Sequence, residues 1–423
     1  MALHIAQGHR QGEHAQFVFF ARHRKVVGAN LGDARNAVLA ALSALGPFSI
    51  DAYLPSFPDI AAKLGATQLE VQQTLSVYLL SFAVMTLWHG AISDRFGRRK
   101  VILVAVGLFA AASFGCMLAT RIEHLWFWRA MQGITAGAGI VVSRAIVRDL
   151  FDGAAAQKLM SQITMMFALA PAIAPVIGGW LQILFGWRSV FAFLVLATAA
   201  LWLACWKLLP ETLPLEKRQS LRPAYLGSTY WQVMTSPAFL TACAALSLNF
   251  GGFFLYILSA PVFLMQHLGV PETGFLWLFG PGMCGLVGGS WISGRLAGRI
   301  SLALTVAIGY AVMGCAAALN LTLNLLLPPG LPWSVLPIFI YTVGMSLAMP
   351  CLSIFALDPF PAQRGLAASC QTFFQSGFNG LAAALIAPAL WGSTLTLALG
   401  MAGMVLIGGS AALLHQRLRL VPR

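Results

Sequence analysis

Long apolar segments alternate with short polar ones along most of the chain. Windows of about 20 apolar residues, the length of a helix that crosses the hydrocarbon core of a bilayer, can be placed twelve times. The sequence therefore predicts a polytopic membrane protein. Spans are expected at residues 36–54, 71–92, 101–120, 125–147, 159–183, 188–209, 237–264, 273–294, 301–327, 333–357, 366–388 and 393–414.

The longest polar stretch between two spans, residues 210–236, divides the predicted helices six and six. The predicted fold is an all-α membrane protein, with 12 transmembrane helices in two six-helix bundles. Residues 1–34 are polar and basic, and we expect a disordered cytoplasmic tail, with contact to anionic lipid as the alternative. The expected domains are a tail at 1–34, a bundle at 35–209, a cytoplasmic linker at 210–236, a bundle at 237–415 and a tail at 416–423.

The basic residues collect on alternate sides of these spans. If the N-terminus is cytoplasmic, 22 of the 26 Lys and Arg lie on the cytoplasmic side, and the outer segments hold Lys63, Arg121 and Arg188. Such an excess is typical of cytoplasmic loops, so both termini are expected inside. The net charge of +13 follows from this topology, and the basic residues gather on no single face that would bind nucleic acid.

Composition agrees with a membrane protein and excludes several classes of function. Hydrophobic residues make up 59% of the chain and charged residues 9%, against about 25% charged in soluble domains. The seven Cys stand singly, almost all in apolar runs, which indicates buried thiols rather than disulfides or a metal site. The sequence has no phosphate-binding GxxxxGK[ST] loop and no nucleophile-base set, so we expect no enzyme, no catalytic residue, no metal and no cofactor.

A charged loop lies between the second and third predicted spans. Residues 93–100 read Ser-Asp-Arg-Phe-Gly-Arg-Arg-Lys, and their five charges must lie outside the hydrocarbon core. After the eighth span, residues 294–299 repeat the Gly and Arg pattern without an acidic residue. A degenerate copy at the corresponding place suggests two related halves.

In this layout the chain resembles the major facilitator superfamily, and most closely its bicyclomycin and chloramphenicol resistance (Bcr/CflA) family of drug:proton antiporters. Residues 90–100 are similar to the superfamily's loop signature, and 129–137 to the antiporters' RxxQGxGxx motif. Residues 170–179 resemble the antiporter motif of span 5, and 51–55 the DxYLP element. Thr86 stands where many relatives have Gln, and the second half matches mainly in layout, which leaves the substrate open.

The resemblance implies that the charged loop is a conformational latch between the halves. Asp94 can pair locally, or it can lie against the positive N-terminus of the eleventh helix, which begins close to Gly365. The alternative is a topology signal with a local salt bridge. The expected latch residues are Gly90, Asp94, Arg95, Gly97, Arg98, Arg99, Arg144 and Arg148.

Span 5 carries a predicted kink. Pro171 and Pro175 remove backbone hydrogen bonds, while Gly178 and Gly179 let another helix approach closely. The resemblance implies that this segment seals the central cavity against leak, and ordinary packing of small residues is the alternative.

Asp51 and Arg129 are the ionisable residues most clearly within spans. Counted at 1.5 Å per residue, Asp51 lies about 22 Å from the inner boundary, and Arg129 reaches a similar depth from the outer one. We therefore expect that they can meet, and that they couple transport to protons. Other polar residues on the spans are expected to line the same cavity, with helix-helix hydrogen bonding as the alternative. They are Tyr53, Tyr78, Gln132, Asn249, Tyr256, Gln371, Gln375 and Asn379.

The function expected from these features is export of small amphipathic drugs in exchange for protons by alternating access. The alternatives are a metabolite permease of the same superfamily, carrying nucleosides, sugars or amino-acid derivatives, and a membrane sensor or membrane-embedded enzyme. The expected partners are a small-molecule substrate, protons and the lipid bilayer, without nucleic acid. The resemblance implies a protein of the bacterial cytoplasmic (inner) membrane, and we expect a monomer.

Overall fold

The structure is a computed structural model that describes residues 34–151, 153–218, 223–360 and 363–420. The regular elements in these four stretches are all helical, and the first covers residues 34–51. The N-terminal half continues with η1 (Leu54–Ser56), α2 (Phe57–Leu64), α3 (Gln68–Phe96), α4 (Arg98–Met117), α5 (Ile122–Leu150), α6 (Gly153–Phe185) and α7 (Arg188–Leu208). The linker contains η2 (Leu215–Lys217) and α8 (Pro223–Met234). The C-terminal half contains α9 (Pro237–Leu258), η3 (Pro261–His267), η4 (Glu272–Phe275), α10 (Leu276–Leu296), α11 (Leu302–Leu326), α12 (Leu336–Leu357), α13 (Arg364–Leu381), η6 (Ala382–Ile386), α14 (Ala387–Ala389) and α15 (Thr394–Leu420).

Ten helices of the described residues are long and apolar enough to cross a membrane. Two predicted spans are not among these ten. The fifth, α6, contributes a shorter apolar part, Leu169–Phe185. The eleventh, α13, carries the predicted polar stripe and continues through η6 into α14. With these two, the twelve predicted segments are all occupied by helices.

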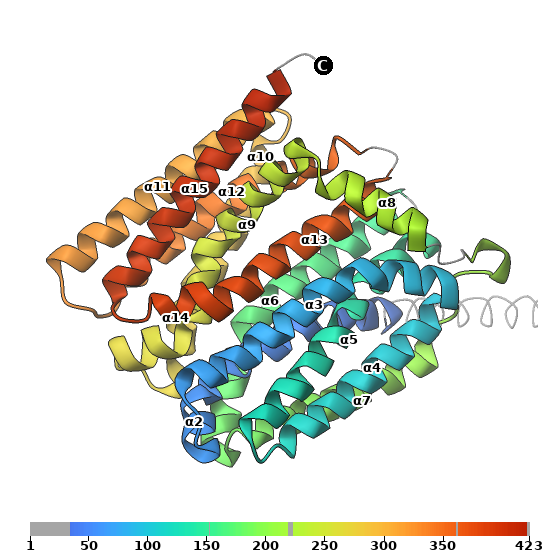
Figure 1. Ribbon diagram of the computed structural model, residues 1–423, viewed down its shortest axis with the longest axis horizontal. Coiled ribbons are helices and arrows are strands. Elements are labelled where there is room, and N and C mark those ends of the chain that lie inside the picture. Colours follow the sequence, from blue (N-terminus) through green and yellow to red (C-terminus); the bar gives the residue numbers. More distant parts are fainter. Residues whose placement is uncertain (1–33, 152, 219–222, 361–362, 421–423) are drawn as a thin grey trace, which may run out of the picture.

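The helices pack as two groups that follow the order of the chain (Figure 1). In the N-terminal half, α5 packs against both α3 and α4, and α4 packs against α7. In the C-terminal half, α12 packs against α9, α10 and α11, and α15 lies against α9. The halves meet where α3 runs alongside α13 and where α6 contacts η4 and α10. We call the end that carries the central linker the linker end, and the opposite end the far end.

The central linker is more ordered than its polar sequence suggests. Its helix α8 packs on α13 and α9, and the hydroxyl of Tyr230 donates to the carbonyl of Leu87 in α3 at 2.6 Å. The last helix reaches Leu420, so it continues past the expected bundle end at residue 415. The expected N-terminal tail lies outside the described residues.

The first transmembrane segment is interrupted directly after Asp51. A continuous helix would need a backbone N–H at residue 55 to donate to the carbonyl of Asp51, and Pro55 has none. Ala52 and Tyr53 therefore form a turn, and the chain continues through η1 into α2. This break places Asp51 at the end of a helix in the interior of the N-terminal half.

Gly133 allows α5 to lie directly against α3. A Cβ atom at this position would overlap the backbone carbonyl of Tyr78, well inside the 3.0 Å that real Cβ atoms essentially never cross. In the motif of residues 129–137, position 133 therefore has no room for a side chain. Close contact between these two helices also brings the side chain of Arg129 within reach of Tyr78.

Candidate functional site

Arg129 is the central charged group of the N-terminal half. Its side chain is fully buried, and its guanidinium lies over two aromatic rings, 4.8 Å from the centroid of Tyr53 and 4.4 Å from that of Tyr78. The Nη1 atom donates to Gln132 Oε1 at 2.8 Å and to the carbonyl of Ser49 at 3.3 Å. Nε and Nη2 of Arg129 have no hydrogen-bond partner. The guanidinium is therefore held by ring faces and neutral oxygens, with two donor atoms free for another acceptor.

A second layer of hydrogen bonds orients the side chains around Arg129. The hydroxyl of Tyr53 shares a hydrogen bond with Thr74 Oγ1 at 3.0 Å, and that of Tyr78 with Ser49 Oγ at 3.0 Å. Three of the predicted cavity residues, Tyr53, Tyr78 and Gln132, thus surround Arg129. Sequence reasoning missed their supporting residues. These are Ser49, Thr74 and Ser113, the last of which accepts from Gln132 Nε2 at 2.8 Å.

Asp51 lies near this cluster but does not pair with Arg129 here. Its side chain is 3% exposed, and the described residues give it no ion pair within 4.0 Å. The groups that contact Arg129 from this segment are the backbone carbonyl of Ser49 and the ring of Tyr53, on either side of Asp51 in the chain. The expected meeting of Asp51 and Arg129 therefore does not occur in this conformation.

The predicted cavity residues of the C-terminal half fall into two groups. Asn249 and Tyr256 are buried within that half, where Asn249 Nδ2 contacts Met313 Sδ at 3.5 Å and Asn320 Nδ2 donates to Tyr256 at 2.7 Å. In the structure these two residues therefore make contacts between helices of one half, which is the alternative to lining a cavity. Asn249 keeps one unpartnered oxygen, Oδ1.

The three polar residues of α13 form the second group. Gln371 exchanges hydrogen bonds with Ser353 at 3.1 and 3.2 Å, and Gln375 is half-buried. Asn379 is buried, and its Oδ1 has no partner. Since α13 is the helix that faces α3 across the interface of the halves, this stripe lies next to the contact between them.

In α6 the two prolines lie inside the helix, and the two glycines that follow contact different halves of the protein. A Cβ atom on Gly178 would overlap the carbonyl of Ala52, in the turn after Asp51. A Cβ atom on Gly179 would overlap the carbonyl of Glu272, at the start of the eighth span. This segment therefore joins the break beside Asp51 to the contact between the halves.

Arg98 is the centre of the charged loop. Its side chain is 9% exposed; it forms an ion pair with Asp94, and Nε donates to Asp149 Oδ2 at 3.1 Å. Its backbone N–H donates to Glu211 Oε1 at 2.9 Å, which caps the start of α4. Gly97 has φ +95, a conformation that favours glycine. Sequence reasoning missed Glu211, since nothing in the linker composition tells which helix a carboxylate will cap.

The other expected latch residues differ in their surroundings. Arg99 Nη2 donates to the carbonyl of Trp206 at the end of α7 at 2.6 Å, and the Arg95 guanidinium lies 5.2 Å from its neighbouring Phe96 ring. A Cβ on Gly90 would make an ordinary contact with Val141, at 3.9 Å. Arg144 and Arg148 are exposed on the last turns of α5. Among the described residues, the ion pair of Asp94 is with Arg98, inside its own half.

At the far end, side chains and backbone of the two halves touch directly. Gln266 Nε2 donates to Gln68 Oε1 at 3.3 Å, and Gln73 Nε2 donates to the carbonyl of Ala384 at 3.1 Å. The Gly179 contact with Glu272 lies at the same end. The far end is thus the place where the halves are joined in this conformation, together with the seam of α3, α13 and α8.

The described residues contain no group of three or more His, Cys, Asp or Glu able to hold a metal ion.

Comparison with known proteins relates this geometry to membrane transporters. The sequence matches the Major Facilitator Superfamily over residues 39–387. It is 37% identical to YdgK, an MFS-type transporter of Bacillus subtilis, over 73% of this chain and 78% of that protein. It is 30% identical to a bicyclomycin resistance protein homolog of Haemophilus influenzae, over 65% of this chain and 69% of that protein. The crystal structure of a D-xylose-proton symporter has a similar fold, with a TM-score of 0.72 and 15% identity over 92% of this chain and 98% of that one.

Proposed function

Because this chain belongs to the Major Facilitator Superfamily, we propose that it exports small amphipathic drugs in exchange for protons by alternating access. The coarser parts of the prediction are confirmed: the chain is a transporter with the superfamily's fold of twelve helices in two bundles, and a multi-pass protein of the bacterial inner membrane. The relatives named for bicyclomycin resistance and, in Pseudomonas aeruginosa, for chloramphenicol resistance support a drug of these kinds as the substrate.

The observation that carries the proposal is the buried cation of Arg129. A charged side chain inside a membrane domain is costly, and such residues are kept where they bind ligands or move ions. Arg129 has no carboxylate partner among the described residues, and two of its donor atoms are free. A buried cation in this condition provides an anchor for either a substrate oxygen or a carboxylate of the protein.

Asp51 is the carboxylate that we propose for proton coupling. An ionised carboxylate buried without a counter-charge is costly, so the unpaired arrangement here suits neutral Asp51. Loss of the proton would favour rotation of the helix end that carries Asp51, and pairing of Asp51 with Arg129. The turn at Ala52 and Tyr53 gives this segment a break at which to move. Proton uptake would separate the pair again and free Arg129 for substrate.

For orientation, we propose that both termini are cytoplasmic, so that the linker end faces the cytoplasm and the far end the outside. The basic residues support this orientation through their excess in segments at the linker end. A tag after Arg423 should be protected from reagents that do not enter intact cells. Labelling of the tag from outside would reverse the orientation.

The test of coupling is Asp51→Asn, with Asp59→Asn as the matched control. Asp59 belongs to the same transmembrane segment but forms a pair with Lys63, at 3.2 Å, beyond the break. Asp51→Asn should abolish proton-driven export in vesicles while drug binding remains, because the amide imitates the neutral carboxyl. Asp59→Asn should retain both.

The substrate test is a resistance panel in an efflux-deficient bacterium, followed by proton movement on addition of each active drug to vesicles. Export of bicyclomycin-like or chloramphenicol-like compounds is expected. Full proton-coupled export by Asp51→Asn would exclude Asp51 as the proton site. Absence of resistance together with transport of a metabolite would exclude drug export.

A further inference from the structure

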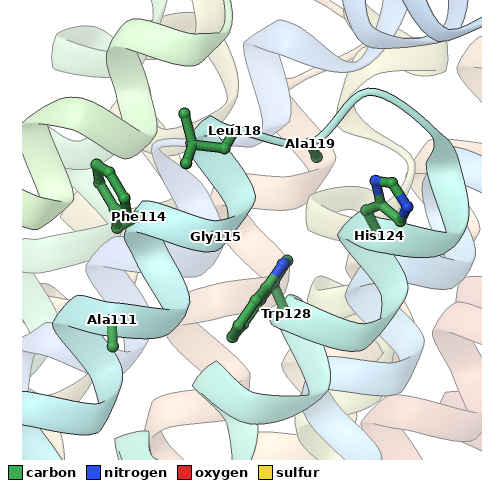
Figure 2. A pocket seen from close by; sticks show the side chains of 7 residues that line it. All are labelled: Ala111, Phe114, Gly115, Leu118, Ala119, His124 and Trp128. Carbon is green, nitrogen blue, oxygen red and sulfur yellow. The ribbon is translucent and has the colours of Figure 1, made fainter.

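A groove opens between the far ends of α4 and α5, on the outside of the N-terminal half (Figure 2). It encloses about 420 Å³. Its wall is mostly apolar and aromatic, with Ala111, Phe114 and Leu118 from α4 and its following turn, and Trp128 from α5. Phe114 and Leu118 are about half exposed, at 48% and 57%. In a membrane protein, such exposed apolar surface on a span faces lipid rather than water.

The floor of the groove depends on Gly115. A Cβ atom there would overlap the indole ring of Trp128, so the glycine lets this ring lie flat against α4. From Ala111 to the residue at the mouth, Ala119, the groove follows α4 for roughly 12 Å at 1.5 Å per residue. This length fits the upper part of an acyl chain in one leaflet of a bilayer.

One cation is bonded to the rim of the groove, and a second follows that rim two residues further along the chain. Arg188 Nη2 donates to the carbonyl of Ala119 at 2.8 Å, and its guanidinium is held 4.3 Å from the ring of Trp187. Arg121 is exposed directly before α5. Among the described residues neither arginine has an ion pair, and the nearby carboxylate of Glu123 leaves the mouth with a positive balance. The imidazole of His124 lies at the same level of the groove.

We propose that this groove binds an anionic phospholipid, with the phosphate at Arg188 and Arg121 and one acyl chain along Phe114, Leu118 and Trp128. An apolar slot below a cationic rim is complementary to such a molecule, because the rim attracts the anionic headgroup and the slot contacts the acyl chain. The inference rests on the placement of the helices in a membrane and is independent of which substrate is exported. Trp128 is followed by Arg129, so the lipid site and the central cation lie on neighbouring faces of one helix.

The test uses the purified full-length protein in detergent and native mass spectrometry during titration with dioleoylphosphatidylglycerol, and in parallel with dioleoylphosphatidylcholine. Arg188→Gln should weaken binding of the first phosphatidylglycerol about fivefold, as expected for one basic residue near a lipid headgroup. Arg188→Lys should keep most of the affinity because the charge remains. Arg299→Gln, a loss of one exposed cation at the linker end, serves as the charge control and should bind as the unmodified protein does.

Variants that fill the groove test the contact with the acyl chain separately from the contact with the charged headgroup. Ala111→Phe should remove the tightest phosphatidylglycerol site, whereas Val104→Phe, on the same exposed face of α4 but outside the groove, should not. Equal affinity for the two lipids, or unchanged binding by both Arg188→Gln and Ala111→Phe in protein of normal thermal stability, would overturn the proposal. Displacement of the first phosphatidylglycerol by the exported drug would do the same, since the groove would then be an entry site for substrate.

Discussion

The adjacent glycines of α6 make two different backbone contacts. Substitution of either glycine by alanine, which adds one methyl group, tests the contact at that position. Gly178 contacts the carbonyl of Ala52 within its own half, and Gly179 contacts the carbonyl of Glu272 across the interface. Alanine at either position places Cβ closer than 3.0 Å to a backbone oxygen, where ordinary contact begins at 3.4 Å. A backbone cannot yield as a flexible side chain can, so the helix and its neighbour must move apart by roughly 1 Å, a displacement that packed interiors resist.

The energetic size of the two substitutions is similar, but the consequences differ. Overpacking of this kind costs about 1–3 kcal/mol. In Gly178→Ala the cost falls on a contact within the N-terminal half, whether or not the halves touch at the far end. In Gly179→Ala it falls on the conformation whose halves touch at the far end. A change of about 1–3 kcal/mol between two conformations shifts their populations about 5- to 150-fold.

The assay measures both the conformation and the stability. Spin labels at positions 68 and 266, whose side chains are hydrogen-bonded across the far end, report the separation of the halves there. Gly179→Ala should transfer population to longer distances with little loss of thermal stability. Gly178→Ala should lower the unfolding temperature in detergent and leave the distance distribution unchanged.

Two results would refute this reasoning. An unchanged distance distribution in Gly179→Ala would mean that its contact with Glu272 does not hold the far end together. Equal opening of the far end in Gly178→Ala would mean that the two contacts act as one unit.

Three further predictions concern the linker end. Asp94→Asn should impair transport while the unfolding free energy falls by at most about 1 kcal/mol, because the Asp94 side chain is 38% exposed and Arg98 keeps its bond to Asp149 in α5. Vesicle transport and thermal unfolding measure the two effects, and normal transport would reduce Asp94 to a topology signal. Glu211→Ala should destabilise the protein by about 0.5–2 kcal/mol through loss of the cap on the Arg98 N–H, with Glu216→Ala, an exposed carboxylate of the linker, as the silent control in thermal unfolding. Tyr230→Phe should speed proteolysis of the linker, because the hydrogen bond of the hydroxyl contributes about 0.5–1.5 kcal/mol to the packing of α8. Burial raises the pKa of Tyr230 to about 12, so the effect should be equal at neutral and mildly alkaline pH. An unchanged cleavage rate would show that α8 is held by packing alone.

The fold was predictable from the sequence because its signals are local. A span needs about 20 apolar residues in a row, and a loop of charges such as residues 93–100 must leave the hydrocarbon core. The motifs added the family, since each occupies a fixed place relative to the spans. The sequence was less informative for α6 and α13, whose prolines and polar stripe reduce the apolar signal.

The site was predictable only in part, because the sequence does not tell which neighbours a side chain will contact. Depth along a helix follows from counting residues, and the structure buries both Arg129 and Asp51 within the N-terminal half. Which groups meet depends on how the segment around the break at Pro55 packs, and Asp51 forms no ion pair with the guanidinium in this conformation. Asn249 and Tyr256 have the polar atoms expected of cavity residues, but their partners lie inside the C-terminal half.

By itself the sequence determined the number and order of the helices, the division into halves and the presence of one deeply buried cation, because hydrophobic length and charge act within a few turns of chain. The tertiary structure alone decided which groups meet. Tyr53 and Tyr78 enclose Arg129, Glu211 caps a helix that begins 113 residues earlier, and Gly179 contacts the opposite half. Such contacts join residues far apart in the chain through the packing of whole helices, and no local pattern of residues encodes that packing.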